Sequence, residues 1–355
     1  MRSDSLRHSY LPRANVLRTV VRYGDRRAVV DSSLGRPLAV ASDSRPAGAA
    51  KPLGPGAPAW ARRLYRRSLL VLRGLIDRRT GAVIAGARRG WAYVWPRDAS
   101  AVAMAFASAG YQAEARRIVR FLQGLDLDAA ARFQPNGEPV DGRGPQGDSA
   151  GWVAGAARAV GLADAQRPQP WRDRADYQEG DSGDYLANAV ASSAGEPQDI
   201  PAGGPAVHRR SEQAIRAHFE AGGMLMREAD DPGSGVDSAA AWTVRPFRLP
   251  ALDPAARRTL LRIAERSGRF GILPSEDWDG GDDPWTAPTA WTAWSLAALG
   301  ERHAALRLMG ELRRDATPAG LLPERVDART GIPISTTPLA WSHAFAILAL
   351  RQLWP

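Results

Sequence analysis

The sequence predicts an all-α fold for residues 58–355, preceded by a short irregular or β-hairpin segment at the N-terminus. From residue 58 onward, eleven segments carry the composition or the apolar spacing of helices, separated by loops of unequal length. Several of these segments end at glycine, the residue that most readily takes the left-handed conformation that follows a helix. We therefore divide the chain into an N-terminal segment, 1–57, and one helical domain, 58–355.

The N-terminal segment has two parts of different composition. The stretch "NVLRTVVRYGDRRAVV" alternates apolar and polar residues, which favours a β-hairpin across "YGDRR". The stretch "SRPAGAAKPLGPGAPAW" is rich in Pro, Gly and Ala, which is typical of a linker.

The first helices are the easiest to justify. Residues 59–76 form the first predicted helix, and 97–110 and 111–125 form a helical hairpin that is broken at Gly110. In the second arm of that hairpin, the apolar residues at i, i+3, i+4 and i+7 lie on one face and should pack inward; they are Ile118, Phe121, Leu122 and Leu125.

The remaining helices follow in sequence order, and Asp237 and Asp253 are candidate N-caps. The eight predicted segments are 148–162, 184–195, 208–223, 236–247, 253–268, 286–300, 301–312 and 338–353, and a short twelfth helix is allowed near 168–175. The loops 126–147 and 268–286 are longer than a helical bundle needs, and long loops on a helical scaffold are where function usually lies.

Charge and composition narrow the classes of function. The net charge of +9 comes from the front of the chain, because residues 1–90 hold 19 Arg/Lys and 5 Asp/Glu, whereas 91–355 hold 28 and 33. A nucleic-acid or membrane-surface function would rest on this net charge alone, without a recognisable binding motif. With no cysteine, thiolate metal ligands, disulfides and a Cys nucleophile are excluded. No apolar run approaches the ~18 residues of a membrane span, and no signal-peptide pattern is visible, so we expect a soluble, cytoplasmic protein.

Three motifs occur in order along the helical domain. They are "YVWPRDAS" before a helical hairpin, "EDWDGGDDPWTAPTAWTAW", and "GLLPERVDARTGIPISTTPLAWSHA" near the end. They resemble three successive signatures of the glucoamylase-type glycoside hydrolases, family 15, which include glucodextranases and trehalase-like enzymes. The similarity runs, with gaps, from about residue 62 to residue 353. It implies an (α/α)6 barrel of six inner and six outer helices, with a sugar pocket formed by loops at one end, and the eleven or twelve predicted helices agree with it independently.

Hydrolysis of a glycosidic bond with inversion needs a carboxylic acid at the leaving oxygen and a carboxylate that activates water, ~6.5–9.5 Å apart. The resemblance assigns the general base to Glu324 in "LLPERVD". On spacing alone, Glu324 could instead be a solvated turn glutamate paired with Arg325.

The resemblance assigns the general acid to Glu179, three residues after Asp176 in "RADYQEGDSGDYLANAV". This segment departs from the family pattern, because Gln178 stands where the family has Trp and Gly180 where it has a second Glu. A ring that would desolvate the acid and a carboxylate that would contact the sugar are therefore missing. On pattern alone Glu179 would be an ordinary surface glutamate.

Sugars are bound by charged groups that fork onto neighbouring hydroxyls and by aromatic rings under the apolar face of the pyranose. By resemblance, Arg97 and Asp98 hold the terminal glucose, and Tyr93 and Trp95 form part of the pocket wall. Trp285 is another wall residue, or else a core tryptophan that anchors the following helix. Asp148 matches a family position near the acid, but it could equally be a helix N-cap.

Three other features of the sequence have no catalytic interpretation. His343 on the last helix is expected to be a core histidine rather than a base. The acidic residues of the second motif lack the order of an EF-hand and are interpreted as a polar rim; they are Glu276, Asp277, Asp279, Asp282 and Asp283. Leu273 stands where the family has an arginine, which removes one expected sugar contact. No metal or organic cofactor is implied.

The sequence thus predicts an inverting, exo-acting hydrolase that releases glucose from α-glucosides, either malto-oligosaccharides and α-glucans or trehalose. The substitutions at Gln178, Gly180 and Leu273 keep open a catalytically weak or silent carbohydrate-binding protein on the same barrel. A nucleic-acid or membrane partner of the basic front is the third hypothesis, and we expect neither partner. The glycosidic linkage and the oligomeric state are left open.

Overall fold

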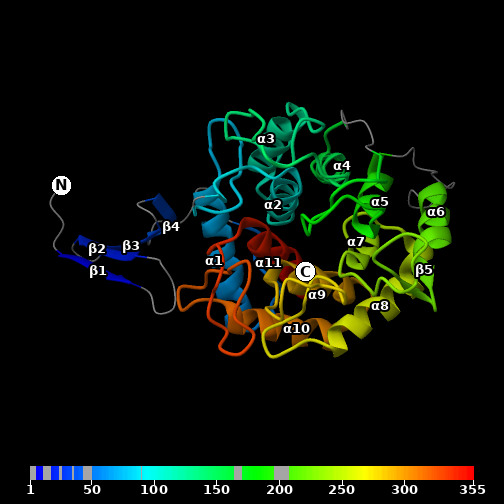
Figure 1. The fold of residues 1–355 in the computed structure, drawn as a ribbon. Coiled ribbons are helices and arrows are strands. Elements are labelled where there is room, and N and C mark those ends of the chain that lie inside the picture. Colours follow the sequence, from blue (N-terminus) through cyan, green and yellow to red (C-terminus); the bar gives the residue numbers. More distant parts are fainter. Residues whose placement is uncertain are drawn as a thin grey trace.

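The structure is a computed structural model, and it describes residues 5–10, 17–23, 26–33, 36–42, 50–88, 90–163, 170–195 and 208–355. Most of the described chain forms a ring of helices, and a small sheet at the N-terminus lies beside it (Figure 1). The predicted all-α class is confirmed for the part after residue 58, where the only strands described are β5, Glu220–Ala221, and β6, Met224–Leu225.

The N-terminal sheet contains the predicted hairpin and extends it. Strands β1 (Ser5–Tyr10), β2 (Leu17–Tyr23), β3 (Arg26–Ser33) and β4 (Arg36–Ser42) form an antiparallel sheet in sequence order. Tyr23 pairs with Arg26, so β2 and β3 are the two arms of the predicted hairpin, and residues 24–25 lie outside the described part of the chain. Strand β4 contacts the first helix of the barrel.

Six helices form the inner wall of the barrel, and each is flanked by the next around the ring. They are α2 (Pro96–Ser108), α4 (Ser149–Ala159), α5 (Leu186–Ser192), α7 (Ala240–Val244), α9 (Thr286–Ala298) and α11 (Ala340–Leu353). Twelve of the fourteen residues of α11 are buried, which is why this segment is apolar all round rather than along one stripe.

Five helices of the described chain pack outside this wall. They are α1 (Ala59–Leu75), α3 (Gln112–Gln123), α6 (Arg209–Phe219), α8 (Asp253–Glu265) and α10 (Arg302–Asp315), and short 3-10 turns lie at Ser193–Gly195 and Pro250–Leu252. An outer helix buries one stripe only; in α3 the buried residues include Ile118 and Leu122, as predicted.

All eleven predicted helices are present within the described residues. The short twelfth helix allowed near 168–175 is not found in 170–175, and residues 164–169 lie outside the described part of the chain. Between α4 and α5 the described chain therefore has no outer helix, and the ring alternates outer and inner helices everywhere else.

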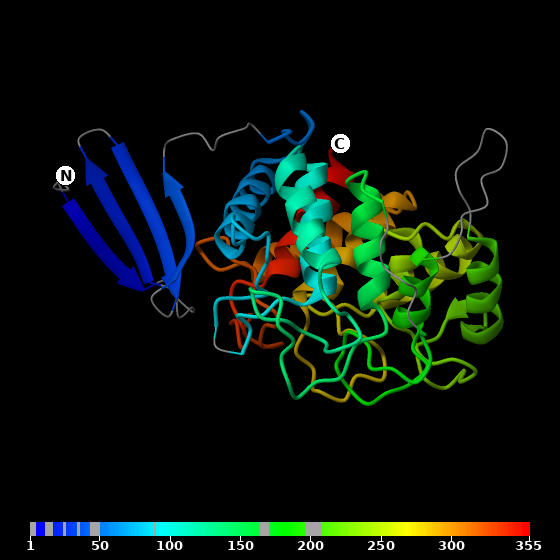
Figure 2. The ribbon, with the colours of Figure 1, turned by 90° about the horizontal axis from the view of Figure 1, so that it is seen from above.

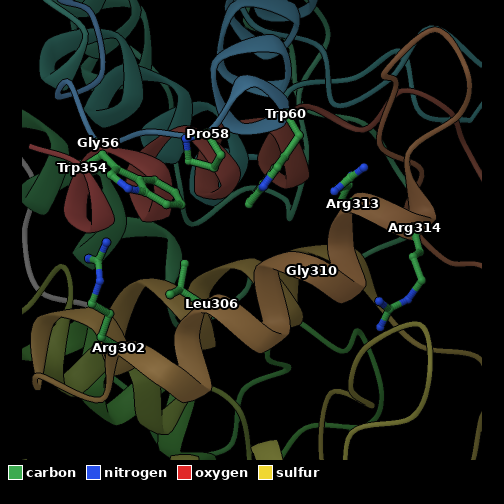
Figure 3. Close-up of a pocket in the computed structure, with 9 residues that line it drawn as sticks. All are labelled: Gly56, Pro58, Trp60, Arg302, Leu306, Gly310, Arg313, Arg314 and Trp354. Atoms are coloured by element: carbon green, nitrogen blue, oxygen red, sulfur yellow. The ribbon is translucent and has the colours of Figure 1, made fainter.

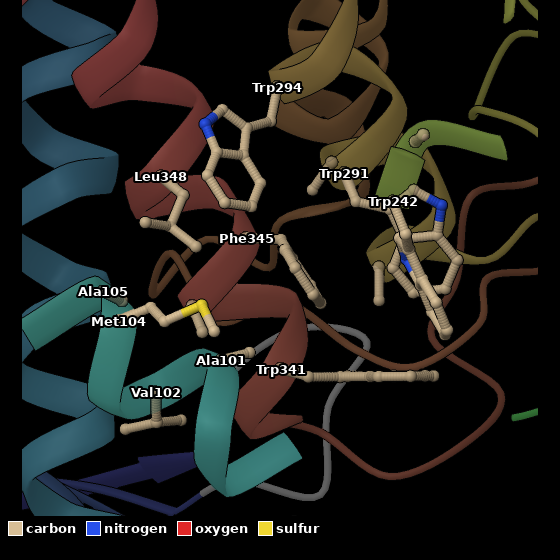
Figure 4. Close-up of a cluster of buried hydrophobic side chains, with 14 of the residues drawn as sticks. Ala101, Val102, Met104, Ala105, Trp242, Trp291, Trp294, Trp341, Phe345 and Leu348 are labelled. Carbon is tan, nitrogen blue, oxygen red and sulfur yellow. The ribbon is translucent and has the colours of Figure 1, made fainter. Parts of the chain in front are cut away.

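A column of aromatic rings fills the centre of the barrel (Figure 4). Trp152 and Trp242 meet edge to face with ring centres 5.0 Å apart, Trp242 meets Trp291 at 5.4 Å, and Trp291 meets Trp341 at 5.3 Å. Such contacts orient the rings as well as burying them. Because Trp341 stands at the start of α11, the column extends to the end of the barrel where the inner helices begin.

The loops that lead into the inner helices gather at that end, as the view in Figure 2 shows. Part of the predicted linker lies on the barrel instead of spanning a gap: Leu53 and Ala57 are buried, and the Gly54 amide donates to the Trp354 carbonyl. Among the helices that the structure describes, none combines the length and the apolarity that a bilayer-crossing segment requires.

Candidate active site

A pocket opens where the inner helices α2, α9 and α11 begin. It is lined by Trp91, Trp95, Arg97, Asp98, Tyr177, Gln178, Glu179, Trp285, Glu324, Leu339 and Trp341. Residues that are far apart in the sequence meet here because each precedes or opens an inner helix. Six of the eight site residues predicted from the sequence are in this lining. Helix N-termini carry unpaired amides and a partial positive charge, so this end of the barrel favours carboxylates and hydroxyl oxygens.

Arg97 is fixed from below by two side chains. It is 3% exposed, and its Nη1 donates to Asp148 Oδ2 at 2.8 Å and to Gln146 Oε1 at 3.0 Å. Its guanidinium carbon lies 4.9 Å from the centre of the Trp341 ring. Its Nε makes no hydrogen bond within the described part of the chain. Arg97 is thus held rigidly through Nη1, while its buried Nε has no hydrogen-bond partner in the described residues.

Asp98 lies next to this arginine, with Oδ2 3.6 Å from Arg97 Nε. Burial raises the pKa of Asp98 to about 7, and the nearby carboxylates of Asp148 and Glu324 add to this, while Arg97 opposes it. The carboxyl group is therefore close to half protonated near neutral pH. In either state it can hydrogen-bond a sugar hydroxyl.

Glu324 is held by the backbone on both sides. Its amide donates to the Thr336 carbonyl at 3.0 Å, and its carbonyl accepts from the Thr286 amide at 3.0 Å. The side chain is buried, 6% exposed, and the Ser335 hydroxyl donates to Oε2. Burial raises the pKa of Glu324, although the Ser335 hydrogen bond and nearby arginines lower it. Glu324 is therefore not the solvated turn glutamate that spacing alone would allow.

Glu179 occupies a tight turn in another loop that lines the pocket. Its amide donates to the Asp176 carbonyl at 3.0 Å, and its φ of 60° lies in the left-handed region, which costs a non-glycine residue of order 1 kcal/mol or more. The Trp95 indole donates to Oε1 at 2.8 Å, and Arg143 forms an ion pair with Oε2. The side chain remains 24% exposed, so Glu179 is neither a free surface group nor a fully buried one.

A buried network supports the turn that carries Glu179. Asp176 accepts from the Gln178 amide at 2.9 Å, and Arg227 lies 3.4 Å from Asp176 Oδ2 and 3.1 Å from Asp237 Oδ2. Burial raises the pKa of Asp176 to about 7, against the opposing effect of Arg227. Gln146 Nε2 donates to the Asp176 carbonyl at 2.9 Å. Since Gln146 also accepts from Arg97, one buried amide joins that arginine to this turn.

Gln178 and Leu273, which depart from the family pattern, differ in their position relative to the pocket. Gln178 lines the pocket, but its side-chain Nε2 donates to Asp237 Oδ2 at 2.8 Å, so it belongs to the supporting network. The ring missing at position 178 is replaced in part by Trp95, which contacts Glu179 and stacks on Trp91 with ring centres 5.8 Å apart. Leu273 is not among the lining residues.

Two predicted site residues lie behind the lining. Asp148 is fully buried and occupies the N-cap position of α4, yet its side chain does not cap the helix and binds Arg97 instead. The Tyr93 ring contacts both Trp95, 6.3 Å away centre to centre, and Arg132, whose guanidinium is 4.9 Å from the Tyr93 ring centre. Trp285 lines the pocket and also stands at the start of α9, so both interpretations, pocket wall and helix anchor, apply to it.

Sequence reasoning missed several residues of the site. They are Trp91, Tyr177, Leu339 and Trp341 in the lining, and Gln146, Arg143 and Arg227 around it. A usable signal existed for Trp341 and Leu339, which close the third motif at the start of a predicted inner helix. Gln146 and Arg227 carry no such signal, because only tertiary contacts give them partners.

The plainer expectations agree with the structure. His343 is fully buried, accepts from the Leu322 amide at 2.9 Å and contacts Ser68, and burial lowers its pKa to about 3. In the acidic segment, Glu276 binds Arg262 at 2.7 Å and Asp277 lies 3.3 Å from Arg227. These two carboxylates therefore pair with arginines, and the pocket rim expected for the acidic segment stays a prediction.

A second depression lies near the opposite end of α11 (Figure 3). It runs along α10 and is lined by Gly56, Pro58, Trp60, Arg302, Leu306, Gly310, Arg313, Arg314 and Trp354. None of these residues is a carboxylate, so this groove has no group that could act as acid or base in hydrolysis. The candidate site is the pocket at the start of the inner helices.

The family model described as "Glycosyl hydrolases family 15" matches residues 59–131, which include Trp95, Arg97 and Asp98. In sequence the chain is similar to "Trehalase 1" of Sulfolobus acidocaldarius, with 26% identity covering 82% of this chain and 63% of that protein. The chain thus spans less than two thirds of the length of this relative.

Solved structures show the fold. A glycosidase in complex with glucose has a TM-score of 0.67 at 22% identity, covering 83% of this chain and 97% of that one. A bacterial glucoamylase complexed with acarbose has a TM-score of 0.63 at 17% identity, covering 82% and 55%. The resemblance that the motifs indicate is confirmed: residues 59–131 match the family 15 glycosyl hydrolases, and the described chain has the (α/α)6 barrel fold of the glucoamylases.

Proposed function

We propose that the chain is an inverting, exo-acting glycoside hydrolase that releases glucose from the non-reducing end of α-glucosides. The observation that carries this proposal is that Glu179 and Glu324 line the same pocket as Arg97 and Asp98. Two carboxylates on separate loops and a charged fork for hydroxyls are the groups that this reaction needs. Trehalose and malto-oligosaccharides are the candidate substrates, because the relatives include a trehalase and the structural neighbours a glucoamylase.

The geometry supports binding of one terminal sugar. Arg97 and Asp98 open α2, and Trp341 lies against Arg97, so charged groups and a ring close one end of the pocket. The indole nitrogens of Trp285 and Trp341 make no hydrogen bond within the described residues. Both rings line the pocket, where the apolar face of a pyranose can stack on them. A pocket closed at one end accepts a chain terminus, which is exo-action.

The chemistry follows from the two glutamates. Protonated Glu179 donates its proton to the glycosidic oxygen, and the bond between C1 and that oxygen breaks. The Glu324 carboxylate removes a proton from water as the water oxygen bonds to C1 from the opposite face. Glucose leaves with inverted configuration, the leaving group departs as an alcohol, and proton exchange with solvent restores both glutamates.

A second candidate function is carbohydrate binding without catalysis. It is favoured by the ion pair between Arg143 and Glu179, because a neighbouring guanidinium stabilises the ionised form that cannot donate a proton. The absent carboxylate at Gly180 points the same way. A silent binder would show saturable affinity for glucosides without product.

The test is glucose release from maltose, isomaltose and trehalose, followed by the anomeric form of the first product. We expect β-glucose from wild type, and loss of glucose release in Glu324→Gln by about 10²–10⁴-fold in kcat, with glucose affinity retained. Glu265→Gln, an exposed glutamate at the end of α8, is the matched control and should behave as wild type. Retention of the α configuration at the C1 that is attacked, or a fully active Glu324→Gln, would reject the proposal.

A further inference from the structure

Four arginines lie next to residues that line the pocket, and we call Arg88, Arg132, Arg143 and Arg325 the rim arginines. They come from three separate loops, those before α2, before α4 and before α11. Arg143 pairs with Glu179, Arg132 lies 5.6 Å from the centre of the Trp95 ring, and Arg325 lies 5.8 Å from that of Trp285. Arg88 and Arg325 are close enough to influence the Glu324 carboxylate.

Most of this positive charge has no carboxylate partner. Within the described part of the chain, Arg143 pairs with Glu179, whereas Arg88, Arg132 and Arg325 form no ion pair. The Nε groups of Arg132 and Arg325 are buried and make no hydrogen bond there. Like-charge repulsion is present as well, since burial lowers the pKa of Arg143 and Arg132 lowers it further. Four guanidinium groups that share one carboxylate partner leave a net positive charge beside the pocket, which favours an anionic ligand.

The position of these charges identifies the part of the substrate that they would meet. The proposed function places the terminal glucose on Arg97 and Asp98. Arg143 contacts Glu179, the group assigned to the leaving oxygen, so it lies on the side of the leaving group. The Arg143 ion pair also presents a mechanistic conflict, because it stabilises ionised Glu179 while the acid must carry a proton. An anion that binds Arg143 in place of Glu179 removes this conflict.

We propose that the site is specific for α-glucosides whose leaving group carries a carboxylate or a phosphate, and that Arg143 binds this anion. The inference rests on the proposed function and names its substrate class. Binding of the anion draws Arg143 away from Glu179, which is then free to accept a proton and act as acid. Arg143 is half exposed, with 42% of its side chain accessible, so this movement breaks one surface ion pair, a contact worth about 1 kcal/mol or less.

The test compares substrates that differ only in this charge. Maltobionate and maltitol share the glucosyl group and an open-chain leaving group, but only maltobionate carries a carboxylate; trehalose 6-phosphate and trehalose form the matched phosphate pair. We expect kcat/KM to be at least about tenfold higher for one anionic member over its neutral partner, which corresponds to about 1.4 kcal/mol. The two pairs distinguish a carboxylate from a phosphate as the preferred anion.

Variants assign the preference to Arg143. In Arg143→Ala the ratio of anionic to neutral kcat/KM should fall to near one, and Arg143→Lys should keep part of it, because lysine retains the charge without the planar fork. Arg257→Ala, an exposed arginine of α8 paired with Glu301, should leave the ratio unchanged. Binding of maltobionate and maltitol to Glu324→Gln, measured by calorimetry, gives the same comparison without turnover.

The outcomes separate the two proposals. Equal hydrolysis of charged and neutral members, or a preference that survives Arg143→Ala, overturns the anion specificity and leaves the hydrolase intact. Binding without hydrolysis that still prefers the anion rejects the hydrolase and keeps the recognition. Equal binding of both members to Glu324→Gln and no hydrolysis of any substrate reject both.

Discussion

The two walls of the pocket hold their glutamates in opposite ways. Glu324 is buried, bonded by the neutral Ser335 hydroxyl and fixed by backbone hydrogen bonds on both sides. Glu179 is partly exposed, paired with the charged Arg143 and placed at a left-handed φ in a four-residue turn. A rigid, desolvated carboxylate suits a group that removes a proton from water. A carboxylate with an exchangeable cationic partner suits a group whose protonation must change when substrate binds.

The two residues have the same side chain and differ only in their surroundings. Removing the same carboxylate from each wall should therefore have different consequences, and the supporting residues should act on one wall at a time. Substitutions around Glu179 and around Glu324 test whether the two effects are independent, and the largest expected effect concerns the two glutamates themselves.

The leaving group distinguishes the two glutamates. Glu179→Gln should lose about 10²–10⁴-fold in kcat on maltose, whose leaving oxygen needs a proton, but only about tenfold on α-glucosyl fluoride, whose leaving group needs none. Glu324→Gln should lose activity on both substrates, because both require an activated water. Steady-state release of glucose and fluoride measures this. Equal losses of Glu179→Gln on both substrates would remove Glu179 from the role of acid.

Gln146 connects Arg97 with the turn that carries Glu179, so the loss of its side-chain amide should affect both. Gln146→Leu leaves Arg97 with one acceptor fewer and frees the Asp176 carbonyl, and we expect kcat/KM to fall about tenfold, the size of one or two buried hydrogen bonds. Glucose affinity measured by calorimetry should weaken in parallel. Gln112→Leu on the exposed face of α3 is the control. Unchanged glucose affinity in Gln146→Leu would mean that the connection is not functional.

Ser335 acts on the Glu324 wall alone. Its hydroxyl donates to the ionised carboxylate and so lowers the pKa of Glu324 against the effect of burial. Ser335→Ala should raise that pKa, and because the base must be ionised, activity should be lost at a higher pH as the solution is acidified. A shift of the acidic limb of kcat/KM by up to about one pH unit is expected. Ser182→Ala, an exposed serine, should leave the profile in place.

The smallest effect concerns stability. The folded-state pKa of Asp98 is about 7, above the ordinary value near 4, so its contribution is fully present below about pH 4 and is lost as the pH rises through about 7. Asparagine cannot ionise, so the Tm of Asp98→Asn relative to wild type should increase by a few degrees across that window. Thermal unfolding measures the difference, and exposed Asp141→Asn should show no such trend. A constant difference between pH 4 and pH 7 would contradict the pKa.

The helices could be read from the sequence because their signals are local. Apolar spacing in α3 and glycine after its hairpin partner indicate the elements without reference to the rest of the chain. The residues that open inner helices, such as Arg97 and Trp285, were found for the same reason, since each lies beside a motif and a predicted helix start. Asp148 was placed at the right helix terminus, but its side chain bonds to Arg97 instead of capping α4.

The partners of the glutamates could not be read in this way. The sequence indicates that the ring expected at position 178 is missing, and it contains no sign that Trp95, 84 positions away, would donate to Glu179. Arg143 lies in a long loop without periodicity, and Gln146 is an ordinary polar residue until the barrel brings α2 and the Asp176 turn together.

The sequence by itself determined the helical class, the order of the helices along the chain and the segments from which the pocket is made, because helix formation depends on spacing and on terminal residues. The tertiary structure alone decided the environment of each carboxylate: a buried neutral donor for Glu324, a half-exposed arginine and an indole for Glu179. Desolvation and charge act over a few ångströms in space, between residues that loop closure brings together across more than 80 positions of chain.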